Sequence, residues 1–232
     1  MTIKDSWPPY QDEPVCVVLG AMPITQREAE EIRSLQDRFL ICADAGLLNA
    51  QKYGFKPDLT MGDFDSLEGG EASVVGEKLN FLVEKDDTDT MLGIKEGISR
   101  GYRRFLLYGS LGGRLDHSLA NIMSLRYLLD EGARGWIMSE ENCVTLLQNG
   151  SMTFERDERY PHFSVFSYEK EARGVRETGF KYVASGVAGA GKTGSLSHTM
   201  TNVFPLGVSN SIVEERATLS VEDGILLIVR AK

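Results

Sequence analysis

Two acidic side chains stand two residues apart in the first half of the chain. Asp63 and Asp65 follow Gly62, and Ser66 closes the run. In an extended backbone alternate side chains point to the same side, so both carboxylates would face one way and Phe64 the other. Two oxygen ligands this close suit a hard divalent cation such as Mg²⁺. The same pattern also occurs in solvated acidic turns, so the metal hypothesis needs support from other segments.

A second acidic segment is the run Lys-Asp-Asp-Thr-Asp at residues 85–89. Thr and Asp cap helix N-termini, and acidic side chains suit the positive end of a helix. Capping accounts for one or two of these residues and leaves the others for chemistry. We expect Asp89 to help hold a metal ion and Lys85 to meet a phosphate group.

The most informative stretch is Gly-Ser-Leu-Gly-Gly-Arg-Leu-Asp-His at residues 109–117. Its glycines let backbone N–H groups approach an anion closely, and the N-terminus of the helix expected after it favours negative charge. Arg114 can bind phosphate oxygens through two nitrogens. Asp116 adds a carboxylate, while His117 fits a base, a ligand or a capping residue equally well. The stretch therefore predicts a phosphate site.

The scaffold that positions these groups follows from apolar runs and helical spacing. Strands alternating with helices predict an α/β fold with a doubly wound, mostly parallel sheet. In such sheets functional groups gather beyond the carboxyl ends of the strands. Asp44, Asp63, residues 85–89 and residues 109–117 all follow predicted strands, so we expect one site there. The predicted strands are residues 15–20, 39–43, 57–62, 80–83 and 104–108, and the predicted helices are residues 25–38, 47–53, 88–100 and 115–131.

The pattern changes near residue 136. Short strand-like runs, separated by Gly, Asn and charged turns, replace the helical periodicity and predict an all-β unit. Separate strands are expected at residues 143–147, 151–154, 217–221 and 224–229, among others. We therefore expect residues 1–140 to form the α/β domain and residues 141–232 to form a β-sandwich.

Composition narrows the classes of function. The 232 residues carry a formal net charge of −9, and this acidity argues against binding to nucleic acid or to anionic membranes. Three scattered cysteines without metal-ligand spacing argue against zinc and fit a reducing cytoplasm. The sequence shows neither the apolar core of a signal peptide nor a membrane-spanning length. We expect a cytoplasmic protein.

One further motif match needs separate treatment. Residues 186–193, Gly-Val-Ala-Gly-Ala-Gly-Lys-Thr, satisfy the Walker A pattern. A P-loop requires a helix after it, and the following segment has no helical period and ends at Pro205. We therefore predict a flexible loop between β-strands rather than a P-loop.

Taken in order, four motifs resemble the thiamine pyrophosphokinase family. They are residues 44–46, 62–66, 85–89 and 112–117, joined in the second half by residues 179–182 and 207–210. Each motif is weak alone, but the ordered set covers nearly the whole chain. The resemblance implies an N-terminal ATP-binding catalytic α/β domain, a C-terminal β-sandwich for thiamine binding and dimerisation, and a homodimer. It also implies Mg²⁺-dependent transfer of the pyrophosphoryl group of ATP to the hydroxyl of thiamine, with release of AMP.

The resemblance also implies roles for individual residues. The implied metal ligands are Asp44, Asp63, Asp65, Asp89 and Asp116. The implied ATP-binding residues are Asp44, Lys85, Thr88, Ser110, Gly112, Gly113 and Arg114. The implied catalytic residues are Asp65, Asp89, Arg114 and Asp116, with either Asp89 or Asp116 as proton acceptor. The implied thiamine-binding residues are Tyr182, which stands where some members carry Trp, together with Ser209 and Asn210, in a pocket that this family shares across the dimer.

Two alternatives stay open at this point. One is pyrophosphoryl transfer to another small alcohol. The other is a nucleotide- or thiamine-binding module without catalysis, which would bind ligand and form no AMP. The complete set of acids with Arg114 favours catalysis, because sensing does not require a metal cluster beside phosphates.

Overall fold

Two groups of elements are visible in the computed structural model, which describes residues 4–6, 13–62, 76–80, 87–183, 186–187, 197–203 and 207–232. Contacts divide the chain into one unit of Asp12–Glu140 and a second of Glu141–Lys232 with Met1–Gln11. The N-terminal strand β1 (Lys4–Ser6) pairs in parallel with β8 (Asn142–Glu155), which is why it groups with the second unit. The sequence had assigned those residues to the first domain.

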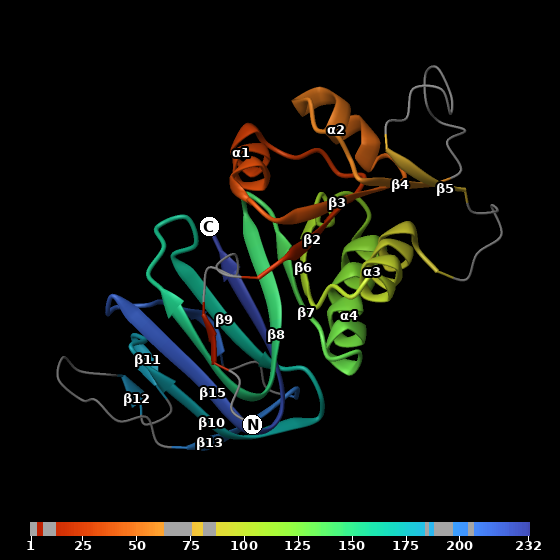
Figure 1. Ribbon diagram of the computed structural model, residues 1–232. Coiled ribbons are helices and arrows are strands. Elements are labelled where there is room, and N and C mark those ends of the chain that lie inside the picture. The colour runs from red at the N-terminus through yellow and green to blue at the C-terminus, as the bar shows by residue number, and fades with distance from the viewer. Residues whose placement is uncertain are drawn as a thin grey trace. The chain divides into compact units, whose positions relative to one another are not determined.

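The first unit is a sheet with helices in the connections between strands (Figure 1). The strands pair in the order β5-β4-β3-β2-β6-β7, and all of these pairs are parallel. Its strands are β2 (Val15–Leu19), β3 (Arg38–Ala43), β4 (Leu59–Gly62), β5 (Glu77–Asn80), β6 (Arg104–Tyr108) and β7 (Arg134–Met138). Its helices are α1 (Gln26–Ser34), α2 (Gly46–Tyr53), α3 (Asp89–Ser99) and α4 (Leu115–Asp130). The predicted alternation of strands and helices is confirmed.

Strand β2 is the first strand of this sheet and lies in its middle. All five of its residues are buried, because helices pack on it from the sheet faces. Its neighbours are β3, the next strand in the chain, and β6, a much later one. The chain therefore continues from β2 toward one edge of the sheet and from β6 toward the other. Ligands of open α/β sheets bind beyond the carboxyl ends of the two strands between which the strand order reverses, which here are β2 and β6.

Local signals set several helix ends. The Thr-x-x-Glu spacing at residues 25–28 predicts a capping box at the start of α1, and it forms: the Thr25 N–H donates to Glu28 Oε2 at 2.7 Å, and the Glu28 N–H donates to Thr25 Oγ1 at 3.3 Å. The expected extension of this helix to residue 38 is wrong, because Leu35 is buried in an extended conformation and ends it. At α2, a glycine directly after the predicted range 47–53 indicates a helix stop, and Gly54 ends the helix with φ +68.

The second unit consists, in its described part, of strands, three of which pair with the long strand β15 (Arg216–Ala231). The first half of β15 pairs with β10, its second half with β9, and nearly its whole length with β8, all antiparallel. The remaining strands are β9 (His162–Ser167), β10 (Glu171–Thr178), β11 (Tyr182–Val183), β12 (Gly186–Val187), β13 (His198–Thr201) and β14 (Gly207–Asn210). This confirms an all-strand second half over the residues that the structure describes.

Two pairs of predicted strands are single strands in the structure. The runs at 217–221 and 224–229 join in β15, and those at 143–147 and 151–154 join in β8. The ladder between β8 and β15 shifts register between Val221 and Ile225. Gly224 absorbs the bend at φ +118, and its N–H donates to Asn149 Oδ1 at 2.9 Å. A glycine that the sequence marked as a break is therefore a bulge within one strand.

A buried carboxyl group in β10 makes a prediction about stability. Glu177 is 8% exposed, and desolvation raises the pKa of its carboxyl from 4.5 to about 7. Because the folded-state pKa is the higher one, its stabilising contribution is complete below about pH 4.5 and is lost as the pH rises toward about 7. We expect Glu177→Gln to gain stability relative to the parent between pH 5 and pH 8, by at most about 3 kcal/mol.

Urea unfolding of the parent and of Glu177→Gln at pH 5 and at pH 8 measures the difference in unfolding free energy. The exposed Glu214→Gln is a matched control that should show no such pH-dependent gain. An equal difference between Glu177→Gln and the parent at both pH values would contradict the raised pKa.

Candidate active site

The carboxyl ends of β2 and β6 meet in two glycine turns. The Gly20 N–H donates to the Tyr108 carbonyl at 2.8 Å, and the Met22 N–H donates to the Gly109 carbonyl at 3.0 Å. A Cβ on Gly20 would lie 2.7 Å from the Gly109 oxygen, and a Cβ on Gly109 would lie 2.6 Å from the Met22 oxygen. Gly109 also adopts φ +64. Only glycine lets the two backbones approach this closely at the expected ligand position.

Asn49 holds the turn after β2 in place, and sequence reasoning missed it. This side chain of α2 is 5% exposed and donates from Nδ2 to the carbonyls of Gly20 at 3.1 Å and Met22 at 2.8 Å. Its Oδ1 accepts from the Ile24 N–H at 3.2 Å, and the Tyr53 hydroxyl donates to the Ile24 carbonyl at 2.7 Å. An Asn inside a helix, where its propensity is poor, was the one available signal.

Asp44 follows β3 in a left-handed conformation, with φ +48. Its N–H donates to the Met61 carbonyl at 2.7 Å. A Cβ on Gly62 would lie 3.3 Å from the Asp44 Cα, so the ends of β3 and β4 are in contact there. Gly62 directly precedes Asp63 in the chain, but Asp63 and Asp65 lie outside the described residues. A non-glycine residue with positive φ at a strand end is a frequent feature of functional sites.

The glycine-rich stretch after β6 adopts backbone conformations that favour glycine. Gly112 and Gly113 adopt φ +107 and +61, which few other residues tolerate. The Gly112 N–H donates to Ser118 Oγ at 3.1 Å. Ser110 is buried, and its carbonyl accepts from Asn121 Nδ2 at 2.8 Å. Side chains of α4 thus hold the stretch against the helix that follows it.

Arg114 and Asp116 form an exposed ion pair at the start of α4. Arg114 Nε lies 3.1 Å from Asp116 Oδ1, and Nη2 lies 2.5 Å from Oδ2. The hydrogen bond from Arg114 lowers the pKa of the Asp116 carboxyl, helped by the His117 N–H at 3.0 Å. Asp116 is therefore a weaker proton acceptor than an ordinary aspartate, and it orients the guanidinium group.

The acidic run before α3 is only partly described, since Lys85 and Asp86 lie outside the described residues. Thr88 caps the helix, accepting from the Met91 N–H at 3.2 Å, as capping alone predicts. Asp87 pairs with Lys95 at 2.6 Å. Asp89 is the first residue of α3 and is half-buried. Capping and pairing thus account for Thr88 and Asp87, and Asp89 stands in the first turn of α3, where an acidic side chain suits the helix N-terminus.

The helices described in this unit differ at their N-termini. Thr25 and Thr88 cap α1 and α3 through their hydroxyl groups. In α2 and α4 the N-cap residues are Ala45 and Arg114, and neither gives a side-chain hydrogen bond to the first turn. These two helices follow Asp44 and the glycine stretch. In α2 the N–H groups of Leu47 and Leu48 already donate to the Asp44 and Ala45 carbonyls, and in α4 the His117 N–H donates to Asp116 Oδ1. Only the remaining N–H groups of each first turn could meet an anion.

A metal ion would find carboxylate ligands here, but the described residues do not complete a site. Among residues 13–62, 76–80 and 87–140, no group of three or more His, Cys, Asp or Glu side chains is placed to hold a metal. Asp44 and Asp89 offer the hard oxygen donors that Mg²⁺ requires. Asp63 and Asp65, the acids that first suggested a metal site, are not among the described residues.

In the second unit, Asn210 ties together two of the predicted thiamine-binding segments. Its Oδ1 accepts from the N–H groups of Tyr182 at 3.0 Å and Ser211 at 2.9 Å, and its Nδ2 donates to the Tyr182 carbonyl at 2.7 Å. Asn210 is buried, whereas Tyr182 is 45% exposed. Ser209 adopts φ +58, and its N–H donates to Ser164 Oγ at 3.1 Å. Asn210 therefore positions Tyr182 beside Ser209.

The Walker A match begins in a β-strand. Gly186 and Val187 form β12, which pairs antiparallel with β11. The rest of the motif, residues 188–193, lies outside the described residues, so the predicted loop stays a prediction.

Comparison with known proteins agrees with the sequence motifs. The family model of the thiamin pyrophosphokinase catalytic domain matches residues 34–137. A curated relative, thiamine pyrophosphokinase of Bacillus subtilis (strain 168), is 26% identical over 195 residues, which cover 82% of this chain and 86% of the relative.

The fold agrees as well. The crystal structure of thiamine pyrophosphokinase from Bacillus subtilis has a TM-score of 0.78 and 22% identity, covering 95% of this chain and 99% of that one. The enzyme from Geobacillus thermodenitrificans has a TM-score of 0.76 and 24% identity, covering 94% and 97%. In the described residues, no helix has the length and apolar character needed to cross a membrane. Over residues 34–137 this chain is thus similar to the thiamin pyrophosphokinase catalytic domain, and in its fold it is similar to thiamine pyrophosphokinases.

Proposed function

We propose that this protein is a thiamine pyrophosphokinase, which transfers the pyrophosphoryl group of ATP to the hydroxyl of thiamine and yields thiamine diphosphate and AMP. The observation that carries the proposal is the family match over residues 34–137. That range holds Asp44, the glycine stretch and the two uncapped helix N-termini. Transfer to another alcohol and a non-catalytic binding module are not favoured.

The ATP phosphates are proposed to bind at the start of α4. Gly112 and Gly113 are proposed to supply backbone N–H groups, with the Gly112 N–H exchanging Ser118 Oγ for a phosphate oxygen, and Arg114 supplies a bidentate cation. Because Asp116 already orients Arg114, little reorganisation is needed when phosphate oxygens arrive. Lys85, Thr88 and the buried Ser110 are further proposed ATP contacts.

Magnesium is the proposed cofactor, with Asp44, Asp63, Asp65 and Asp89 as its ligands. When bound, Mg²⁺ supplies positive charge that bridges and neutralises phosphate oxygens. Asp116, the fifth predicted ligand, pairs with Arg114 in this structure, so we propose that it acts mainly through that arginine. Because the Asp116 carboxylate is engaged by Arg114, Asp89 is the proposed acceptor for the proton of the attacking hydroxyl.

Thiamine is proposed to contact Tyr182 and Ser209, with Asn210 holding them in position.

We also propose a homodimer, in keeping with the family pattern. Leu115, Leu119 and Met123 recur every four residues on α4 and are 72%, 50% and 65% exposed, which is a large apolar stripe for a surface helix. Light scattering of the purified protein should give twice the monomer mass. A reducing cytoplasm is the proposed location, because all three cysteines are free and buried.

The direct test is incubation with Mg-ATP and thiamine. We expect AMP and thiamine diphosphate to form in equal amounts, and AMP formation to stop when EDTA is added. Parallel incubations with other small alcohols test the first alternative. Ligand binding without AMP would instead establish the non-catalytic module.

A further inference from the structure

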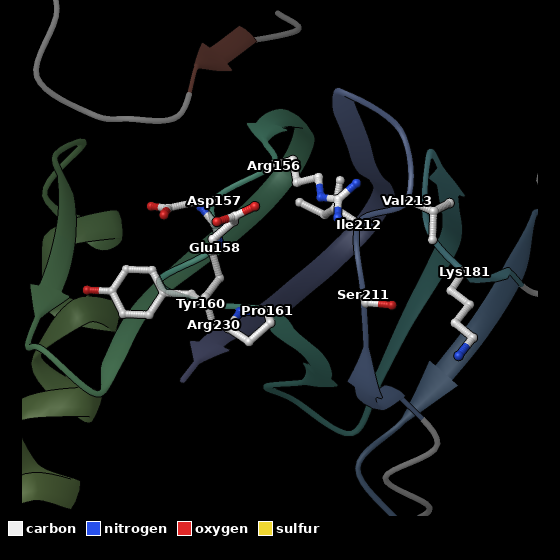
Figure 2. Close-up of a pocket in the computed structure, with 10 residues that line it drawn as sticks. All are labelled: Arg156, Asp157, Glu158, Tyr160, Pro161, Lys181, Ser211, Ile212, Val213 and Arg230. Atoms are coloured by element: carbon white, nitrogen blue, oxygen red, sulfur yellow. The ribbon is translucent and has the colours of Figure 1, made fainter.

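A cavity of about 470 Å³ lies within the second unit, separate from the residues proposed above for ATP (Figure 2). Charged side chains from several segments line it, among them Arg156, Lys181 and Arg230, and Pro161, Ile212 and Val213 add apolar surface. Its volume is typical of small-molecule sites. We propose that this cavity binds a small organic anion, in which a carboxylate or phosphate group is attached to a compact apolar body.

Arg230 provides a fixed cation in the lining. Its side chain is 1% exposed, its Nη2 donates to the Glu155 carbonyl at 3.2 Å, and its guanidinium carbon lies 5.7 Å from the centre of the Tyr160 ring and 6.0 Å from that of Phe154. Burial lowers the pKa of this group, which shows that its charge is poorly solvated. Arg230 therefore contributes positive charge from beneath the lining, and the exposed guanidinium of Arg156 is the group placed for bidentate binding of carboxylate or phosphate.

The charges around Arg230 leave a positive excess. The nearby Asp157 carboxylate accepts from Arg159 Nε and from the Arg159 N–H, each at 2.9 Å, and it also interacts with Arg230. One carboxylate is therefore shared by two guanidinium groups. Arg156 and Lys181 add two cations to the lining, against one further acid, Glu158. In a chain of net charge −9, this local excess favours an anion.

The apolar side of the cavity is built on hydrogen-bonded backbone. The Lys181 N–H donates to the Ser211 carbonyl at 2.9 Å, and the Val213 N–H donates to the Gly179 carbonyl at 2.9 Å. Phe180 and Ile212 form a bridge between these donors. The two segments therefore hold Ile212 and Val213 in fixed positions, and a rigid apolar surface beside cations selects ligands with an apolar body.

The experiment titrates the full chain with three probes that share one ring: phenyl phosphate, benzoate and benzylamine. Backbone amide shifts in NMR spectra report binding at residues 156–161 and 211–213. We expect at least one anion to bind at least about tenfold more tightly than benzylamine, and the two anions show whether phosphate or carboxylate is preferred. No anion binding, or equal binding of benzylamine, would overturn the proposal.

Variants locate the site. Arg156→Gln removes an exposed lining cation and should weaken anion binding about tenfold, as expected for one charge-assisted hydrogen bond. Arg173→Gln makes the same charge change on β10 outside the cavity and should leave affinity unchanged. Arg114→Gln should also leave it unchanged, which separates this cavity from the proposed ATP site. Equal losses in the Arg156 and Arg173 variants would reduce the effect to net charge and refute the site.

Discussion

Replacing Asp44 by Asn should lower kcat for AMP formation by at least about 100-fold while the protein stays folded. Asp44 is proposed to hold the metal at the end of β3, and even indirect changes around a metal reach roughly that size. Asn lacks the charge but tolerates the left-handed backbone that Asp44 adopts at φ +48. The hydrogen bond from this residue to the Met61 carbonyl uses the backbone N–H and is retained.

The same strand offers a matched control. Asp37 is exposed and directly precedes β3, whereas Asp44 directly follows it. Asp37→Asn makes an identical change of charge at the amino end of the strand, and turnover should stay at the parent level. Steady-state kinetics at saturating Mg-ATP and thiamine, with thermal melts of each variant, make the comparison. Parent-like turnover in Asp44→Asn would remove this residue from the metal site.

Replacing Gly46 by Ala should destabilise the protein by about 3 kcal/mol or more. A Cβ at this position would lie 1.8 Å from the carbonyl oxygen of Leu19 and 3.2 Å from that of Gly20. Both atoms belong to the backbone at the end of β2, so no side-chain rotation relieves the overlap. Helix α2 would have to move away from the sheet, and forced repacking of this kind costs several kcal/mol at its upper end.

Gly54, at the other end of α2, separates steric overlap from backbone strain. It adopts φ +68, but a Cβ there would meet no atom within 4 Å. Gly54→Ala should therefore cost only about 1 kcal/mol, the penalty of a left-handed alanine. Urea unfolding of the two variants measures the difference. Equal losses of unfolding free energy would show that α2 shifts freely at its N-terminus.

Sequence reasoning succeeded where a feature depends on neighbours in the chain. The capping box at Thr25 and the helix stop at Gly54 are both local. The strand ends that carry Asp44 and the glycine stretch were also predictable, because apolar runs mark buried strands.

Features that join distant positions were not predictable from one sequence. Asn49 stabilises a turn 25 to 29 residues before it, and no local sequence motif connects positions that far apart. The merging of two predicted strands into β15 depends on partners that hold both halves of the strand in one ladder. The orientation of Arg114 by Asp116 is local, but side-chain geometry decides it rather than residue type.

The long strand β15 also constrains how the second unit is assembled during synthesis. Strands β8, β9 and β10 are all translated before β15, yet each of them takes it as a partner. Until β15 has been synthesised, those three strands expose unpaired edges, which can pair with other molecules. Folding of this half should therefore be slow and late, and a nascent chain stalled before residue 216 would be a client for chaperones.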